Sequence, residues 1–305
     1  DEGGESLEAN YNVIKIECAR DFLFDSTGHP SWKGSLIIGN PQYELRQRDL
    51  GEPEKGGIEP QRTFQINADD IQPLPFSGIE VQQVGKRCGC AYYSGFEASK
   101  NLLLSASGYR VIHVATHGYF DLSEEGETMY SSCLLFAGVK NWLKTGELSR
   151  VYGNGIVTAD EISRMDLRSV ELVVLSSCLS GMNEAFDDKG FYGMIGAMSA
   201  AGVHYVISHL WAANDFTTAI LMDAFYYQYA EQHRSPPVAL SLAKNYLRQV
   251  TIGELKRRHW FDSVKLAALD DKSRQMIAQY ENLNDWIRPF QNEAYWGGFA
   301  CYRCN

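Results

Sequence analysis

Residues 171–181 read ELVVLSSCLSG, an apolar run that ends abruptly in a cysteine set among serines and closed by a glycine. A short apolar run bounded by polar residues predicts a buried strand. The end of such a strand, where the backbone turns, is where α/β folds hold their reactive groups. The stretch therefore predicts one strand of a covered sheet and one candidate nucleophile, Cys178.

Outward from this stretch, apolar runs alternate with segments of helical spacing. The apolar runs predict strands within 34–44, 109–118, 131–138, 203–211 and 294–304. Helices are predicted at 76–89, 96–108, 158–167, 190–202, 215–232 and 236–250. Thr158 and Glu161 have the spacing of a capping box, whereas residues 51–75 are rich in Gly, Pro and charge and predict a mobile loop. This alternation predicts an α/β fold with a mostly parallel sheet and helices on both faces.

Composition narrows the function classes. The chain has 305 residues, 45% of them hydrophobic, which is enough for one large domain with a buried core. Its net charge of −10 offers no electrostatic footprint for nucleic acid or an anionic membrane, and mildly favours a basic peptide or partner. No apolar run approaches the roughly 20 residues that span a bilayer. We therefore expect direct contact with neither nucleic acid nor membrane.

The first residues and the cysteines give expectations about cellular location and about metal or cofactor binding. The first residues, DEGGESLEAN, lack an initiator Met and the regions of a signal peptide, so we expect a piece of a longer protein with a domain upstream. The seven cysteines are scattered, unlike a disulfide framework, and favour the cytoplasm. Cys88 with Cys90 and Cys301 with Cys304 are close pairs, and the second has a zinc-compatible spacing. Cys301 lies at a strand end, however, so we expect unpaired thiols, no metal and no cofactor.

Two predicted strands end in reactive side chains, His117 in VATHG and Cys178 in LSSC. The carboxyl ends of parallel strands meet at one edge of a sheet. There an imidazole lowers the pKa of a thiol below about 8.5 and supplies a proton to a leaving amine. Gly118 lets its N–H approach a substrate carbonyl, and the Cys178 N–H can be the second oxyanion donor. The pattern predicts acyl transfer by a Cys–His pair.

Each of these residues also has a non-catalytic interpretation. A strand-end histidine can be a satisfied core residue, and a free cysteine is commonly inert. His113 and His117, four residues apart, could suggest a zinc pair on a helix. The segment is β-branched, however, and Val114 stands where a metalloprotease motif has Glu. His113 points to the same side of an extended chain as His117, and we treat it as structural.

Taken in order, the sequence blocks resemble a CHAT domain, the caspase-like module often found behind tetratricopeptide repeats and related to separase and the caspases. The blocks are VIHVATHGYFD, NGIVTADEI, VELVVLSSCLSG, GFYGMIGAMSAAGVHYVISHLWAANDFTTAILMDAFY and YWGGFACYRC. LIIGNP and PLPFSGIEVQQV fit the opening of the same family. The resemblance covers nearly the whole chain, from Leu36 to Cys301, and implies a caspase-like fold.

The resemblance implies a caspase-type cysteine endopeptidase. In that family the histidine of ATHG is the general acid–base, here His117, and the cysteine of LSSC is the nucleophile, here Cys178. Gly118 and the Cys178 N–H would form the oxyanion hole. Family members commonly have SAC followed by Glu or Gln and Thr-Gly, whereas this chain has SSCLSG with Leu179. The dyad is intact, but subsite details do not carry over.

The segment SHLWAAND is similar to the stretch that borders the substrate in separases and caspases, and makes His209, Trp211 and Asp215 candidates for substrate binding. Asp215 could instead cap the helix that follows. Asn214 can serve as that cap, which leaves Asp215 to pair with a basic P1 side chain, ideally Arg. Separases have an acidic residue near this point and prefer Arg.

We expect a single domain over residues 1–305. Its N-terminal part is 1–105, and its catalytic part, 106–305, carries a polar helical insertion near 251–290 as a candidate docking piece. CHAT proteins resemble effectors of bacterial defence in which an upstream tetratricopeptide-repeat or other sensor domain frees the protease. The expected function is regulated cleavage of a specific protein partner. The alternative is a non-catalytic caspase-like interaction module, although degeneration would remove His117 or Cys178 and both are present.

Overall fold

A seven-stranded sheet forms the centre of the molecule, in the order β1-β11-β10-β8-β4-β2-β3. The strands are β1 (Lys15–Ile16), β11 (Phe299–Arg303), β10 (Tyr205–His209), β8 (Leu172–Leu175), β4 (Val111–Ala115), β2 (Ser35–Pro41) and β3 (Tyr92–Gly95). Neighbouring strands are parallel from β10 through to β3, and β11 is antiparallel to β10. The prediction of an α/β fold with a mostly parallel sheet is confirmed.

The computed structural model describes residues 15–16, 34–51, 66–120, 132–176, 179–180, 188–209, 211, 214–262, 266–267 and 269–304. Cys178 and most of the predicted loop at 51–75 lie outside these ranges. Residues 66–75 are described and hold the short 3-10 helix η3 (Ala68–Asp70), followed by an extended segment that leads into the first long helix. None of the helices in the described ranges is long and apolar enough to cross a membrane.

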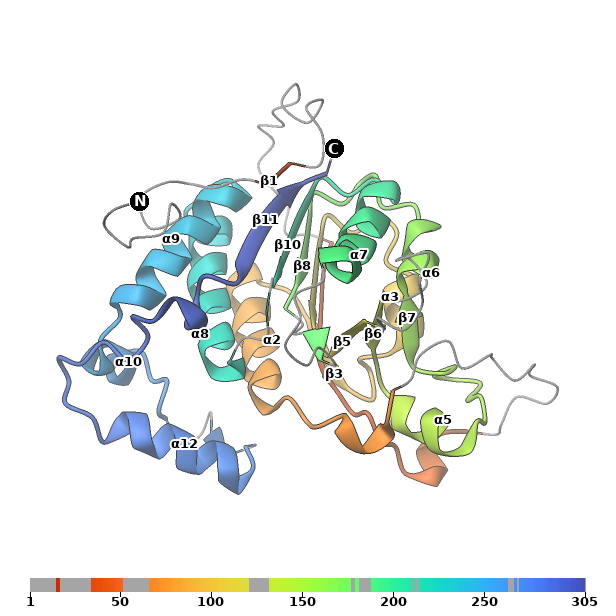
Figure 1. Cartoon of the computed structure of the whole chain (residues 1–305), viewed down its shortest axis with the longest axis horizontal. Helices are drawn as coiled ribbons and strands as arrows, with labels where there is room; N and C mark the ends of the chain where they lie inside the picture. Colours follow the sequence, from red (N-terminus) through yellow and green to blue (C-terminus); the bar gives the residue numbers. More distant parts are fainter. Residues whose placement is uncertain are drawn as a thin grey trace.

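Helices cover both faces of the sheet, as predicted (Figure 1). One face packs against α2 (Pro75–Cys88), α8 (Asp215–Tyr226) and α9 (Pro236–Gln249), and the other against α3 (Lys100–Leu104), α6 (Ala159–Ser163) and α7 (Asp188–Ala200). Successive strand residues point to opposite faces. Accordingly, Val111 and Val174 belong to the first core cluster, and Ile112 and Val173 belong to the second. This is why the central strands read as unbroken apolar runs.

A second, four-stranded sheet, which the sequence did not predict as a sheet, lies beyond the carboxyl ends of β4 and β8. Its order is β7 (Ile156–Thr158), β6 (Ser132–Leu135), β5 (Gly118–Phe120) and β9 (Leu179–Ser180). Strands of two to four residues are too short to show a period in the sequence, and only β6 had been predicted. Two of them continue the central strands: β5 follows β4, and β9 follows β8.

The residues that start several helices are those expected from the sequence. Thr158 and Glu161 form the predicted capping box at the start of α6. Prolines open both α2 and α9, where the missing N–H costs no hydrogen bond. The helix predicted over 96–108 is shorter, because Ser99 caps it and it begins only at Lys100.

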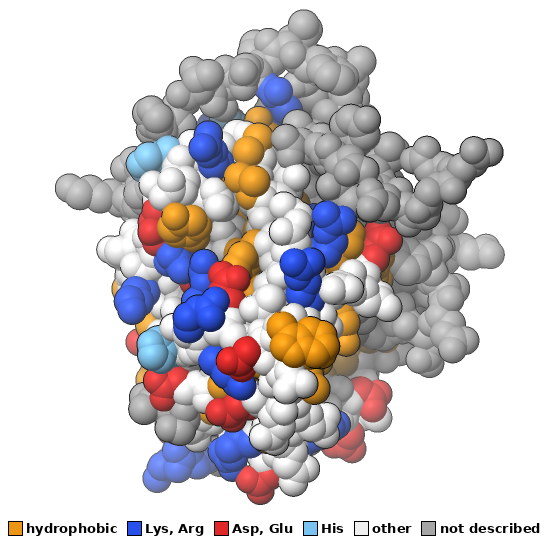
Figure 2. All heavy atoms as spheres, turned by 90° about the vertical axis from the view of Figure 1, so that its left-hand side faces the viewer, with side chains coloured by type: hydrophobic (Ala, Val, Ile, Leu, Met, Phe, Trp, Pro, Cys, Tyr) orange, Lys and Arg blue, Asp and Glu red, His pale blue; other side chains and the backbone are white. Residues whose placement is uncertain are grey.

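The remaining described elements are peripheral. They are η2 (Gln47–Asp49), α5 (Val139–Thr145), the π-helical turn Tyr227–Glu231, α10 (Ile252–Arg257), α12 (Asp271–Glu281) and η5 (Glu293–Tyr295). The helices α10 and α12 lie within residues 251–290, and the prediction that this segment is an insertion stays a prediction. On the face that α9, α10 and α12 present, Lys and Arg side chains alternate with Asp and Glu (Figure 2). Within residues 251–290, Lys256 pairs with Asp285 at 2.8 Å and Arg274 pairs with Asp271 at 2.6 Å.

Candidate active site

The site lies where the chain leaves the large sheet and enters the small one, which it does twice (Figure 1). Before the two crossings, Val114 of β4 pairs in parallel with Leu175 of β8. After them, Gly118 of β5 pairs in parallel with Leu179 of β9. Three residues separate the two paired positions on each segment, 115–117 in one and 176–178 in the other, and Ala115 still pairs with Gly39 of β2. We call these two three-residue segments the crossings. The two crossings start in register and end in register.

His117 is the last residue of the first crossing and Cys178 the last of the second. His117 is buried, with 8% of its surface exposed. Cys178 lies outside the described residues, and so does Ser177. Ser176 is described, and its backbone N–H donates to the carbonyl of Val114 at 2.9 Å. The predicted approach of the imidazole to the thiol stays a prediction.

The imidazole of His117 is oriented by a backbone carbonyl. Its Nε2 lies 2.6 Å from the carbonyl oxygen of Gln72, in the extended segment before α2. A carbonyl oxygen only accepts, so Nε2 carries the proton and Nδ1 is the basic nitrogen of the neutral ring. Burial lowers the pKa of His117, and the bond to Gln72 opposes that shift. Both features suit a general base, which must be neutral at working pH and held by a third group.

The backbone of His117 is held on both sides. Its N–H donates to the hydroxyl oxygen of Tyr43 at 3.2 Å, and its carbonyl accepts from the N–H of Leu135 at 2.9 Å. The ring of Tyr43 also lies beside the imidazole, with 5.2 Å between ring centroids and 38° between planes. Neither Tyr43 nor Gln72 was predicted as part of the site. The rigid PLP that follows Gln72, with two prolines, is the one sequence signal for a fixed backbone there.

Asp215 has a different partner from the one expected. Asn214 caps α8, as predicted, by accepting from Thr217 N at 3.2 Å. The Oδ2 of Asp215 accepts from Phe76 N at 2.8 Å. The residue before α2, Leu74, makes no side-chain cap, so Asp215 caps α2 from the neighbouring helix.

The environment of Asp215 alters its charge. Burial raises its pKa to about 7, the bond from Phe76 opposes this rise, and the charge of Glu80 adds to it. The residue keeps partial solvent exposure. Its charge is also one of the lesser influences that raise the pKa of Tyr43, after burial. Asp215 therefore lies within electrostatic reach of the ring beside His117, and the segment from Gln72 to Phe76 joins the two sites.

His209 and Trp211, the other predicted substrate-binding residues, lie on the β10–β11 side of the sheet. His209 is buried against Phe299, with 3.5 Å between ring centroids, and burial together with the charge of Lys244 lowers its pKa to about 3. The indole Nε1 of Trp211 donates to Ala294 O at 3.4 Å. Both contacts are made with the segment 294–299, and the substrate-binding roles of both residues stay predictions.

His113 is part of β4, and its ring lies between the sheet and the helices α2 and α8. It is fully buried, its Nε2 is 3.0 Å from Oε1 of Glu80, and its Nδ1 is 3.2 Å from the hydroxyl of Tyr226. Both ring nitrogens therefore face polar side chains of the core, which fits a structural histidine. No three His, Cys, Asp or Glu side chains in the described ranges gather as a metal site would require.

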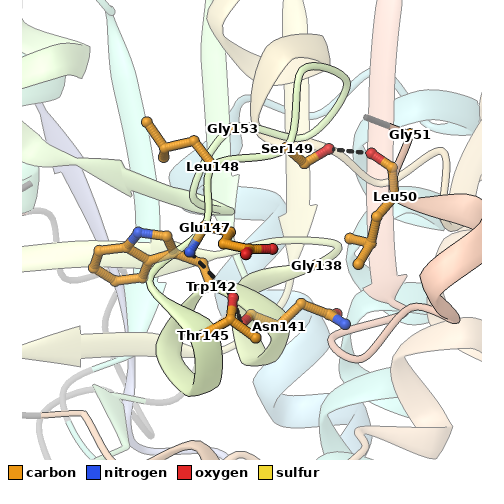
Figure 3. A pocket seen from close by; sticks show the side chains of 10 residues that line it. All are labelled: Leu50, Gly51, Gly138, Asn141, Trp142, Thr145, Glu147, Leu148, Ser149 and Gly153. Atoms are coloured by element: carbon orange, nitrogen blue, oxygen red, sulfur yellow. Dashed lines mark hydrogen bonds between the residues drawn. The ribbon is translucent and has the colours of Figure 1, made fainter. Parts of the chain in front are cut away.

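A shallow hollow of about 380 Å³, partly open to solvent, lies beside α5 (Figure 3). Trp142, Asn141 and Leu50 are among the residues that line it, and Ser149 Oγ donates to Leu50 O at 2.7 Å at its edge. The residues around it include none of those predicted for catalysis or substrate binding. It is therefore separate from the site at the two crossings.

Comparison with known proteins bears on the whole chain. The protein-family model for the CHAT domain matches residues 10–303. A comparison with curated proteins finds none that matches. The family match takes in the segment with Tyr43 and Gln72 as well as the segments with His117 and Cys178, so every residue of the candidate site lies within it.

Proposed function

The chain belongs to the CHAT domain family, a caspase-like and protease-related family, and on this premise we propose that it is a cysteine endopeptidase with His117 and Cys178 as its dyad. The observation that carries the proposal is the double register of the crossings, Val114 with Leu175 and Gly118 with Leu179. His117 and Cys178 each precede a paired residue by one peptide bond, which spans about 3.8 Å between Cα atoms.

The proposed mechanism starts with His117 as base. Gln72 holds the Nε2 proton, so Nδ1 takes the proton of the Cys178 thiol. The thiolate attacks the peptide carbonyl carbon, and the electron pair of the C=O bond moves to its oxygen. The N–H groups of Gly118 and Cys178 would stabilise this oxyanion. When the intermediate collapses, the C–N bond breaks and His117 gives its proton to the leaving amine.

The second half of the reaction, deacylation, regenerates the free enzyme. Water attacks the acyl-enzyme, His117 takes a proton from that water, and the C–S bond breaks to release the acid and restore the thiol. The Gln72 carbonyl supports both halves, because a hydrogen bond from a charged imidazolium is stronger than one from the neutral ring. The lowered pKa of His117 favours the neutral form before substrate binds.

The proposed substrate is a protein cut after a basic residue, ideally Arg, with Asp215 as the pairing carboxylate. Oδ2 of Asp215 is engaged by Phe76, and a carboxylate has a second oxygen to offer. A guanidinium beside it would favour the charged form and lower the raised pKa again. By family analogy, the proposed role is a regulated effector in bacterial defence or signalling, in the cytoplasm, under an upstream tetratricopeptide-repeat or other sensor domain.

The test is co-expression of the chain with candidate partner proteins, followed by detection of a cleavage fragment. The fragment should vanish with Cys178→Ala and persist with Cys90→Ala, which removes a half-buried thiol two residues beyond α2. In parallel, a peptidyl chloromethyl ketone should label wild type at Cys178 faster than at the other cysteines. A Cys178 that is labelled no faster, together with no fragment, would favour the non-catalytic interaction module.

A further inference from the structure

A buried chain of hydroxyl groups ends on the backbone of His117. The His117 N–H donates to Tyr43 Oη at 3.2 Å, Tyr43 Oη lies 3.0 Å from Thr116 Oγ1, and the Thr116 hydroxyl donates to the carbonyl of Leu135. Each hydroxyl has a single proton to give. Because Thr116 gives its proton to Leu135, Tyr43 donates to Thr116 and turns a lone pair towards the His117 N–H.

The chain closes into a ring. Leu135 N–H donates back to the His117 carbonyl at 2.9 Å, so both peptide groups that flank His117 are fixed. Tyr43, Thr116 and Leu135 expose 5%, 0% and 1% of their surfaces, so water is a poor substitute for any of these bonds. Burial also raises the pKa of Tyr43 far above its usual value. The hydroxyl therefore stays protonated and acts as donor and acceptor together.

We propose that Tyr43 is a positioning residue for the Cys–His dyad, an inference that rests on the proposed function. Its hydroxyl fixes the backbone of His117, its ring limits the swing of the imidazole, and Gln72 fixes Nε2. Together these contacts set the direction in which Nδ1 points. A misplacement of about 1 Å at a catalytic group can cost about 100-fold in rate.

The position of Tyr43 in the chain makes this role distinct from that of the dyad. It follows β2, is 74 positions from His117, and belongs to neither crossing. Tyr43→Phe keeps the ring beside the imidazole and removes the hydroxyl alone. Thr116→Val removes the next hydroxyl at nearly constant volume, and Thr116→Ser keeps it.

The test compares these variants by peptide cleavage and by thermal unfolding. Tyr43→Phe should lower kcat about 10- to 100-fold with little change in KM, because chemistry and not binding is disturbed. Thr116→Val should lower kcat in the same direction, and Thr116→Ser should recover it. The control is Tyr226→Phe, which removes another buried hydroxyl, the one that contacts His113. It should lower the melting temperature and leave kcat as in wild type.

A second readout does not depend on turnover. The rate at which iodoacetamide alkylates Cys178, followed against pH, reports the thiol pKa that His117 lowers. Tyr43→Phe should move the inflection upwards, towards the ordinary thiol value of about 8.5. A wild-type kcat and profile in Tyr43→Phe, with only the stability loss seen in Tyr226→Phe, would overturn the positioning role. If Tyr43→Phe does not fold, equal kcat in Thr116→Val and Thr116→Ser overturns it. Absence of peptide cleavage by wild type, together with an ordinary thiol profile, would instead refute the proposed function.

Discussion

His113 and His117 stand four residues apart on one run of chain, and the two surroundings differ. His113 sits in the core between Glu80 and Tyr226, with a side-chain partner within 3.2 Å at each ring nitrogen. His117 lies two residues beyond the end of β4, and its Nε2 lies 2.6 Å from the backbone carbonyl of Gln72. The surroundings of His113 are buried side chains of the core, which fits a structural ring. At His117 a backbone carbonyl orients the ring, and a general base needs such an orienting group.

Replacing each histidine with alanine should distinguish their roles most clearly. His117→Ala should lower kcat/KM by at least about 1,000-fold, because the dyad would lose its base. Thermal stability should change little. The double variant with Cys178→Ala should be no worse than either single variant, because the two residues act as a unit. Additive losses in peptide cleavage would contradict the dyad.

At His113 we expect the opposite result, a loss of stability with little loss of activity. His113→Ala should destabilise the fold by about 3 kcal/mol, because it opens a cavity in the core and removes the ring nitrogen that lies 3.0 Å from the buried Glu80 carboxyl. Urea unfolding measures this loss, and kcat/KM of the folded fraction should stay near that of wild type. A variant with intact stability and lost activity would make His113 the catalytic histidine and break the comparison.

Substitutions of Asp215 test whether its carboxylate determines the preference for the P1 residue. With Arg, Leu and Asp at P1, wild type should prefer Arg, and the preference should collapse in both Asp215→Ala and Asp215→Asn. If Asp215 serves only as the cap of α2, Asn should restore cleavage of all three peptides, because its oxygen still accepts from Phe76. A wild-type preference for Asp at P1 would contradict an acidic pocket.

The smallest expected effect concerns pH and stability. The pKa of Asp215 is raised to about 7 in the folded protein, so the folded state favours the neutral form. Burying the carboxylate costs stability above pH 7, and this cost disappears as the pH falls from about 7 towards the unfolded pKa of about 3.9. Asp215→Asn should therefore raise the melting temperature at pH 8 more than at pH 5. An equal shift at both pH values would show that the carboxyl titrates normally.

His117 contributes with the opposite dependence on pH. Burial lowers its folded pKa below the unfolded value of about 6.5, so the folded state binds its proton less readily. Its contribution is neutral above that value and becomes destabilising as the pH falls towards the folded pKa. Cleavage should accordingly persist to a lower pH than an exposed histidine would allow.

The sequence alone determined the features that depend on residues close together in the chain. The unbroken apolar runs predicted the central strands, because each is buried on two faces, and Thr158 with Glu161 predicted the start of α6. Strand ends also marked His117 and Cys178 as candidates, because the carboxyl edge of a parallel sheet is where loops can hold reactive groups.

Only the tertiary structure decided what surrounds His117 and Asp215. The small sheet is built of strands too short to show a period, and it exists because β5 and β9 pair where β4 and β8 end. The contacts of His117 with Gln72 and of Asp215 with Phe76 span 45 and 139 positions. A backbone carbonyl or N–H belongs to every residue type, so no pattern of side chains foretells which one will be used. The packing of α2 and of the segment before it against the sheet determines which backbone group makes each contact.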